Sequence, residues 1–310
     1  MSELPLVSIV TETYKDFDGL FENIKSVLMQ DYPCIEYIIS DDGSGNFPID
    51  EVKSFIDNNK RKNIIDVIYI IAEHNRGTVK SEGYAYHCAS GDILMPLAGD
   101  DRFVSNDVVS LVVKTFQRTG CDILSTSRIV VDNDDNELYK LPLKNNIAKI
   151  QKLDTAQKQY FALLKGMFYD MASGSVLYMK KEFLEKMGGY DERFVLWEDA
   201  PFLLKVLGKG EKICVDYDIN SIFYRTGGVS TGNCNPLYLR DKSLFNETLV
   251  YEHYFELPRD VKRFIDHNKR SSLCKSKFDK LKVYIVDFDV MIQKMVYKLK
   301  DYIAKNVFKN

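Results

Sequence analysis

The segment Tyr37-Ile38-Ile39-Ser40-Asp41-Asp42-Gly43-Ser44 joins a short apolar run to two carboxylates and a turn. A continuous apolar run that is rich in β-branched residues is typical of a strand buried on both faces of a parallel sheet. Similar runs occur at 7–10, 67–71 and 93–95. We therefore expect four parallel strands in the first hundred residues, with polar side chains directly after some of the strand ends.

Helical patterns lie between these runs. Apolar residues in 17–28 recur at a spacing near 3.6 residues, and segment 78–90 is rich in small residues. Alternation of strand and helix predicts a doubly wound α/β fold, a mixed but mostly parallel sheet flanked by helices. Ligands of such sheets bind where the strands end, at the carboxyl edge. The polar residues at that edge are therefore the candidates for a functional site.

The order of elements is less regular after residue 121. We expect further strands at 123–125, 129–131, 176–178 and 213–215, and helices near 155–166 and 199–207.

The charge balance and the prolines suggest where the α/β part ends. Pro236 and Pro258 punctuate the chain, and residues 259–310 hold 14 Lys and Arg against 6 Asp, a local charge of +8 in a chain of net charge −3. We predict an α/β domain over 1–235 and a helical extension over 236–310.

The composition excludes several classes of protein. With 45% hydrophobic and 28% charged residues, the chain is neither disordered nor collagen-like. No stretch of 18 residues lacks a charge and no basic N-terminal segment precedes an apolar run, so we expect no spanning helix and a cytoplasmic location. Six scattered cysteines without Cys-x-x-Cys spacing favour reduced thiols over a zinc cluster or a disulfide framework. We expect no nucleic-acid partner.

The first polar motif is Asp41-Asp42, followed by Gly43 and Ser44. Two carboxylates offer acceptors for sugar hydroxyls or base N–H groups, and the glycine lets the backbone approach a ligand closely. The alternative is an Asx-turn that opens the next loop. The motif alone does not decide between these two roles.

The second motif is Asp100-Asp101, which follows the apolar run at 93–95. Adjacent carboxylates are hard oxygen ligands suited to Mg²⁺ or Mn²⁺, and a cation there would neutralise a departing diphosphate. The alternative is that an Asp caps the next helix. Ser105 and Asn106 are better placed for that cap, which favours cation binding by the two carboxylates.

The third motif is Glu198-Asp199, which opens the helix expected at 199–207 directly after Trp197. A carboxylate at a helix N-terminus can serve only as a cap that the helix dipole stabilises. A carboxylate that faces an acceptor hydroxyl is also what a general base requires. This motif, too, leaves both roles open.

Together, in this order and at these intervals, the three motifs resemble the family 2 glycosyltransferases, which have the GT-A fold. The similarity runs from residue 4 to about 232. Segment 7–14 resembles the family's opening strand and nucleotide loop, Asp41-Asp42 the carboxylates that contact base and ribose, and Asp100-Asp101 the metal and diphosphate motif. Glu198-Asp199 match the family's Glu-Asp motif, whose Asp is the base.

Further correspondences lie between and after these motifs. Segment 75–92, from Asn75-Arg76-Gly77 to Ala89-Ser90-Gly91-Asp92, keeps the family's Asn-x-Gly and its closing Ala-x-Gly-acid. Gly174-Ser175 and segment 188–194 resemble the acceptor-side strand and turn. Tyr224-Arg225 and Gly228-Val229-Ser230 resemble a late loop that folds over the diphosphate.

The resemblance implies an inverting transfer from a nucleotide sugar, with UDP as the expected carrier, to a glycan or lipid-linked acceptor in cell-surface polysaccharide or glycoconjugate synthesis. It implies a divalent cation, Mn²⁺ or Mg²⁺, as cofactor. The implied catalytic residues are Asp199, as base, and Glu198; the metal ligands are Asp100 and Asp101; the acceptor side has Gly174, Ser175 and Trp197. The implied nucleotide-sugar-binding residues are Thr11, Glu12, Thr13, Tyr14, Asp41, Asp42, Asn75, Gly77, Lys80, Asp100 and Arg225.

Two departures from the family pattern concern the nucleotide. Glu12 stands where the family usually has Pro, and Ser81-Glu82-Gly83 where it has Ala-Arg-Asn. A cationic contact to the nucleotide is therefore missing, or Arg76 or Lys80 supplies it.

Two more departures concern the metal. Ala98 replaces the first Asp of the usual Asp-x-Asp, and Thr226-Gly227 stand where a His often completes the site. These changes motivate a second hypothesis, a non-catalytic GT-A partner subunit that stabilises another glycosyltransferase. The intact Glu198-Asp199 argues against it, because a scaffold needs no base.

The C-terminal region carries a separate pattern, an apolar seam with alternating spacings of four and three residues. We predict one long basic amphipathic helix near 278–306 whose seam is buried against the body or in a homo-oligomer, with lysines at the solvent or membrane side. Attachment to an anionic membrane surface, at the inner face of the plasma membrane, is a further alternative. The seam consists of Leu281, Ile285, Phe288, Ile292, Met295, Leu299 and Tyr302.

Overall fold

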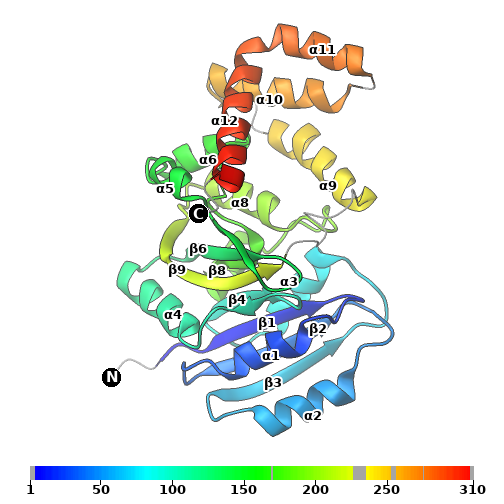
Figure 1. Cartoon of the computed structure of the whole chain (residues 1–310), viewed down its shortest axis with the longest axis vertical. Helices are drawn as coiled ribbons and strands as arrows, with labels where there is room; N and C mark the ends of the chain where they lie inside the picture. Colours follow the sequence, from blue (N-terminus) through cyan, green and yellow to red (C-terminus); the bar gives the residue numbers. More distant parts are fainter. Residues whose placement is uncertain (1–3, 169, 226–234, 253–255, 275, 308–310) are drawn as a thin grey trace.

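The computed structural model describes residues 4–168, 170–225, 235–252, 256–274 and 276–307 (Figure 1). Its centre is one nine-stranded mixed sheet with strand order β3-β2-β1-β4-β8-β6-β9-β5, and β7 pairs with β6. The strands are β1 (Val7–Thr13), β2 (Ile35–Asp41), β3 (Ile64–Ile71), β4 (Ile93–Ala98), β5 (Arg102–Phe103), β6 (Ile123–Val131), β7 (Glu137–Leu141), β8 (Leu177–Lys180) and β9 (Cys214–Arg225).

Helices cover both faces of this sheet, which confirms the predicted α/β class. The larger ones are α1 (Leu20–Leu28), α2 (Ile49–Asn59), α3 (Thr78–Cys88), α4 (Val108–Thr119), α6 (Ala156–Leu164), α8 (Asp199–Gly208), α9 (Pro236–Glu247), α10 (Arg259–Ser272), α11 (Lys277–Val286) and α12 (Phe288–Val307). The shorter ones are α5 (Lys144–Ile150), α7 (Lys181–Met187) and two 3₁₀ turns, η1 (Gly174–Val176) and η2 (Leu249–Tyr251).

The four expected parallel strands form one half of the sheet. β1 lies between β2 and β4, and β2 pairs with β3, all in parallel. In this register Thr13 is the partner of Asp41, and Glu12 is the partner of Ala98. Because parallel strands end at the same edge, the loops that carry Asp42 and Asp100 leave the same edge of the sheet, one on each side of β1.

Alternation along the strands divides the core into two layers. Ile9 packs with α1, α2 and α4 on one face, whereas its neighbour Val10 packs with α3, α7 and α8 on the other. Both side chains are fully buried, as expected for a central parallel strand. The edge strand β3 differs from the expectation of burial on both faces, because Ile65 and Ile71 are exposed there.

The second half of the sheet corrects two sequence predictions. Segments 123–125 and 129–131 belong to one strand, β6, because the polar residues between them are buried with partners: Thr126 Oγ1 and Ser221 Oγ lie 2.5 Å apart, and Ser127 Oγ donates to the Tyr217 carbonyl at 3.0 Å. The strand expected at 213–215 continues to residue 225.

The cap expected at Ser105 or Asn106 is also wrong. The N-cap of α4 is Asp107, and its side chain makes no capping bond because it accepts the Ser105 hydroxyl at 2.5 Å instead.

The C-terminal helices gather at one end of the molecule, opposite α2 and β3 (Figure 1). Phe245, Val250 and Ile265 share a buried cluster with Phe194 and Leu204 of the α/β part. Residues 236–272 are thus packed against the sheet domain through a common apolar core.

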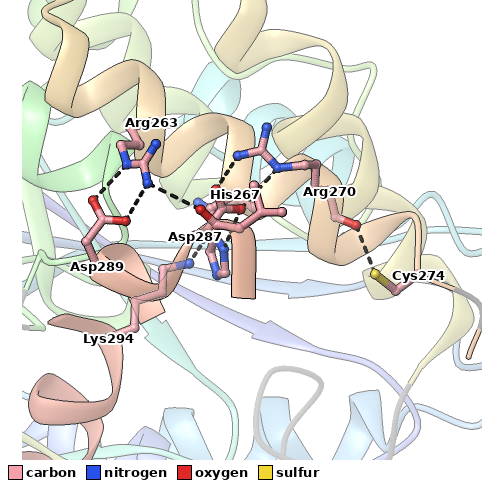
Figure 2. Close-up of polar contacts among 9 residues, drawn as sticks. Arg263, His267, Arg270, Cys274, Asp287, Asp289 and Lys294 are labelled. Carbon is pink, nitrogen blue, oxygen red and sulfur yellow. Dashed lines mark hydrogen bonds and ion pairs between the residues drawn. The ribbon is translucent and has the colours of Figure 1, made fainter. Parts of the chain in front are cut away.

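The prediction of one helix over 278–306 is wrong. The chain breaks at Asp287 into α11 and α12, because this fully buried carboxylate accepts hydrogen bonds from Arg270 and contacts His267 of α10 (Figure 2). The predicted seam is not buried against the body: each of its seven members is exposed, from 42% at Ile292 to 69% at Ile285. Among the described residues, none of the helices is long and apolar enough to cross a bilayer.

Two glycine substitutions test how tightly the chain packs before β4. A Cβ on Gly91, just before β4, would collide with Ser8 Oγ and lie 2.6 Å from Ser8 N, whereas a Cβ on Gly83 in α3 would meet no atom within 4 Å. We expect Gly91→Ala to lower the free energy of unfolding by about 3 kcal/mol through overpacking. Gly83→Ala should raise it by about 0.5–1 kcal/mol. Urea unfolding measures both; equal effects would contradict the packing at Gly91.

Candidate active site

The loops after β2 and β3 are joined by Asp42. Its carboxylate accepts the backbone N–H groups of Arg76, at 2.9 and 3.1 Å, and of Gly77, at 2.8 Å. Gly77 has φ +83°, and a Cβ there would press into Val195. The Asn75-Arg76-Gly77 motif thus has a structural reason: Asp42 fixes this loop, and only glycine fits its turn.

Asp41 is fully buried and forms the Asx-turn that was the alternative for this motif. It accepts the Ser44 N–H at 2.9 Å, the Ser44 hydroxyl at 2.5 Å and the Thr13 hydroxyl at 3.2 Å. Thr11 is also buried, and its hydroxyl donates to Asn23 Oδ1 at 2.9 Å. Of the implied nucleotide-binding residues, the exposed ones are Tyr14, Asn75 and Lys80.

The two carboxylates after β4 have different surroundings. Asp101 is buried: its Oδ1 accepts the Arg225 N–H at 2.9 Å, and its Oδ2 has no hydrogen-bond partner. Burial and then the adjacent Asp100 raise the pKa of Asp101 well above its usual value. Asp100 is partly exposed; burial raises its pKa, and the nearby Arg225 guanidinium offsets only part of that rise.

Asn23 of α1 was missed by the sequence analysis. Its amide donates to the carbonyls of Ala98, at 2.8 Å, and Asp101, at 2.7 Å, while its oxygen accepts the Thr11 hydroxyl. It therefore holds the Ala98–Asp101 turn against the end of β1. The sequence feature that could have identified it is a polar Asn within the apolar helical pattern of 17–28.

The residues after β4 could bind a divalent cation only together with ligands from the substrate. Within the described part of the chain, no group of three or more His, Cys, Asp or Glu side chains could hold a metal. Mg²⁺ and similar ions are commonly bound by one or two carboxylates together with substrate phosphates. Asp100, partly exposed beside Arg225, is a suitable single carboxylate for that arrangement.

Asp199 begins α8 and is held by two backbone groups. Its Oδ2 accepts the Gly174 N–H at 3.0 Å and its Oδ1 accepts the Ala200 N–H at 2.6 Å. These donors and the helix N-terminus stabilise negative charge on Asp199. A Cβ on Gly174 would displace Glu198 Oε1, so glycine at this position leaves room for the Glu198 carboxylate where η1 meets α8.

Glu82 and Glu198 lie near Asp199, Glu12 lies near these two glutamates, and burial raises the pKa of all three. For Glu198 the neighbouring Asp199 and Glu82 raise the pKa further; for Glu12, whose Oε1 is buried without a partner, Glu82 and Glu198 do so. Glu82 accepts hydrogen bonds from Tyr86 and Tyr190, at 2.6 and 3.3 Å, and its pKa is raised to about 7. Burial and neighbouring like charge thus favour the protonated form of each of these glutamates.

Asp241 of α9 was missed because it lies beyond the predicted domain end. Its fully buried carboxylate accepts the N–H groups of Val195, Leu196 and Trp197, at 2.8, 2.7 and 3.2 Å. The indole of Trp197 packs on Phe245, with ring centroids 5.0 Å apart. The segment that leads into Glu198-Asp199 is therefore positioned by the C-terminal helices.

Arg128 of β6 is a second missed residue. Its guanidinium donates to the hydroxyls of Ser173 and Ser175, at 2.5 and 2.7 Å, and lies over the ring of Tyr224. Arg128 thus links the turn that precedes Gly174 to the end of β9. The late-loop residues Thr226-Gly227 and Gly228-Val229-Ser230 lie outside the described residues.

Comparisons with known proteins identify the family. Residues 8–183 match the family model described as glycosyl transferase family 2. This chain belongs to that family. The match covers more than half of the chain and includes the Asp41-Asp42 and Asp100-Asp101 motifs, so the resemblance inferred from the sequence is confirmed.

Curated relatives match a shorter segment of the chain. An uncharacterized glycosyltransferase of Mycobacterium tuberculosis is 33% identical over 121 residues, which is 39% of this chain and 43% of the relative. A putative teichuronic acid biosynthesis glycosyltransferase, TuaG of Bacillus subtilis, is 28% identical over 136 residues, 44% of this chain and 52% of the relative. The chain thus spans about half, or less, of the length of these relatives.

Solved structures share the fold over most of the chain. TarS 1–349 of S. aureus, in complex with UDP-GlcNAc, has a TM-score of 0.61 at 16% identity and covers 93% of this chain and 79% of TarS 1–349. The mannosyltransferase PcManGT of Pyrobaculum calidifontis, with GDP-Man and Mn²⁺, has a TM-score of 0.56 at 13% identity and covers 95% and 76%. These similarities show that the fold is GT-A.

The pH dependence of the free energy of unfolding tests the raised pKa of Glu82. The unfolded chain releases the Glu82 proton near the usual pKa of 4.5, whereas the folded chain keeps it until about 7. The free energy of unfolding contributed by Glu82 therefore falls as the pH rises from about 4.5 to about 7. We expect Glu82→Gln, which still accepts the tyrosine hydroxyls, to be more stable than the parent by on the order of 2–3 kcal/mol above pH 7, and no more stable near pH 4.

Glu51→Gln on the exposed surface of α2 is the matched control, and urea unfolding at pH 4, 6 and 8 is the measurement. A gain for Glu82→Gln that is the same at each pH would show that Glu82 does not hold its proton in the folded state.

Proposed function

We propose that this protein is an inverting glycosyltransferase that moves a sugar from a nucleotide sugar, with UDP as carrier, to an acceptor hydroxyl. The observation that carries the proposal is Asp199, a carboxylate held by two backbone N–H groups beside glutamates whose pKa values are raised, in a family 2 chain. A GT-A neighbour in complex with UDP-GlcNAc and one with GDP-Man support a nucleotide sugar as donor.

In the proposed reaction Asp199 takes the proton from the acceptor hydroxyl. The hydroxyl oxygen then bonds to the anomeric carbon from the side opposite the diphosphate, and the bond between that carbon and the diphosphate breaks, with the electron pair leaving on the diphosphate. The configuration at the anomeric carbon inverts. Burial and neighbouring carboxylates raise the pKa values of Glu198 and Glu12, which favours their protonated forms and makes them less suited than Asp199 to take a proton.

The difference in exposure between Asp100 and Asp101 supports Asp100 as the ligand of a divalent cation, Mn²⁺ or Mg²⁺. When bound, the cation would offset charge that develops on the leaving diphosphate. Asp101 acts through Arg225: it holds the Arg225 backbone, and the guanidinium of Arg225 donates to Asp135 at 2.9 Å beside the proposed diphosphate position.

Side-chain exposure also indicates which of the implied residues could contact the nucleotide directly. Tyr14, Asn75 and Lys80 are exposed near the strand ends and are the direct nucleotide contacts that we propose. Gly174 and Ser175 would border the acceptor, whereas Trp197 supports the acceptor side through its packing on α9. The relative named for teichuronic acid biosynthesis supports a role in cell-surface polysaccharide or glycoconjugate synthesis. We propose a cytoplasmic location for this role.

A non-catalytic partner subunit remains the second candidate. Glu82 favours it, because a buried acid occupies the position of the family's usual arginine. An enzyme needs Asp199 for turnover and must bind the nucleotide, whereas a non-catalytic partner subunit needs neither. Two experiments therefore separate the two candidates.

The first experiment measures consumption of a panel of UDP sugars with candidate acceptors. Loss of a general base typically costs 10²–10⁴-fold in rate, so we expect Asp199→Asn to lower turnover by about that factor while its affinity for UDP stays near that of the parent. Glu198→Gln is the matched control and should lose far less. An active parent whose rate is unchanged in Asp199→Asn would refute the assignment of the base.

The second experiment measures UDP binding by calorimetry with and without Mn²⁺. We expect Mn²⁺ to tighten UDP binding in the parent and not in Asp100→Asn, because this variant lacks the proposed ligand. Tyr139→Phe, a change on the β6–β7 hairpin, serves as a control for general effects of substitution. Persistence of the Mn²⁺ effect in Asp100→Asn would refute the ligand assignment, and absence of binding at millimolar UDP would favour the partner subunit.

A further inference from the structure

The helices α11 and α12 expose a large apolar face. Ile285, Phe288 and Leu299 have 69%, 59% and 59% of their surface exposed, values far above those of core residues. The C-terminal half of this face forms a shallow groove lined by Ile292, Met295, Val296, Lys298, Leu299 and Tyr302. An exposed apolar surface of this size marks an interaction site. The other exposed apolar residues of α11 are Phe278, Leu281, Tyr284 and Val286.

The face points outward because the opposite side of α12 is fixed to α10. Val290 is buried, and Asp287 at the break accepts two hydrogen bonds from Arg270, at 2.6 and 3.0 Å. Arg263 of α10 binds both oxygens of Asp289, at 2.6 and 2.7 Å (Figure 2). These contacts occupy one side of α12 and leave the apolar side without cover from the described part of the chain.

Positive charge accompanies the apolar face. Lys277, Lys280, Lys282 and Lys298 are exposed on the same two helices. The carboxylates that the structure describes on α11, at the break and on α12 all have partners: Asp279 accepts the Ser276 hydroxyl, while Asp287 and Asp289 bind arginines. The face is therefore apolar and basic, which matches an anionic bilayer in both respects.

A second copy of the chain fits this face less well. The seam that would form a coiled coil is divided between two helices by the break at Asp287, so its heptads do not continue along one axis. Two copies that met through this face would also bring lysines of the same sign together. Both observations favour lipid over self-association.

We propose that the α11–α12 face docks on the surface of an anionic lipid bilayer, with its apolar side chains in the headgroup boundary and its lysines at the lipid phosphates. The Arg270–Asp287 and Arg263–Asp289 pairs fix the two helices in the orientation that presents this face. This surface is separate from the carboxylate cluster, so the proposal is independent of the proposed chemistry.

The test is co-sedimentation of the full chain with vesicles of phosphatidylcholine, with and without phosphatidylglycerol, at low salt. We expect binding to the anionic vesicles alone. Replacing Lys277, Lys280 and Lys282 by Gln should weaken binding about 100-fold, because each basic residue near such a surface contributes ~1 kcal/mol, or about fivefold. The triple variant Lys62→Gln, Lys114→Gln, Lys209→Gln is the control and should bind like the parent.

A second pair of variants tests the apolar contribution. Ile285→Ser with Leu299→Ser should abolish vesicle binding and leave the melting temperature and UDP affinity unchanged. Ile65→Ser with Ile71→Ser, two exposed positions on β3 at the opposite end of the molecule, should have no effect on binding. Light scattering of the same proteins reports the oligomeric state. A dimer that Ile285→Ser with Leu299→Ser dissociates, equal binding to neutral vesicles, or no vesicle binding would each overturn the proposal.

Discussion

Burial of neighbouring carboxylates at one edge of the sheet is the constraint on which the site depends. Glu12, Glu82 and Glu198 lie where β1 ends and α8 begins, and burial, followed by the charge of neighbouring carboxylates, raises the pKa of each. Loss of water and nearby like charge both disfavour the ionised form of a carboxyl group. Asp199 differs from these glutamates because its carboxylate accepts the backbone N–H groups of Gly174 and Ala200.

The remaining carboxylates of the edge have a structural task. Asp42, Asp101 and Asp241 are buried, and each accepts backbone N–H groups from a segment that is distant in the sequence. They hold the loop after β3, the end of β9 and the segment before Glu198 in place. The same residue type thus positions three loops and, at Asp100 and Asp199, remains available for a cation and a proton. The C-terminal helices take part because Asp241 belongs to α9.

The sequence predicted the elements whose residues follow a single local period. Apolar runs located β1 to β4, and parallel register then explains why Asp42 and Asp100 leave the same edge. Features that depend on partners far along the chain were not predictable. The break at Asp287 depends on Arg270 across a helix pair, and the middle of β6 is polar because its hydroxyls pair with β9. The proposed difference in role between Asp100 and Asp101 follows from their difference in burial, which the sequence of two adjacent Asp residues does not reveal.

The central claim is that burial and neighbouring carboxylates raise the pKa values of Glu12, Glu82 and Glu198. The most direct measurement is an NMR pH titration of isotope-labelled side-chain carboxyl carbons, assigned with Glu12→Gln, Glu82→Gln and Glu198→Gln. We expect the Glu82 resonance to titrate near pH 7, and those of Glu12 and Glu198 to titrate well above the usual value of 4.5. Three glutamates that titrate at their usual value, near pH 4.5, would contradict the account.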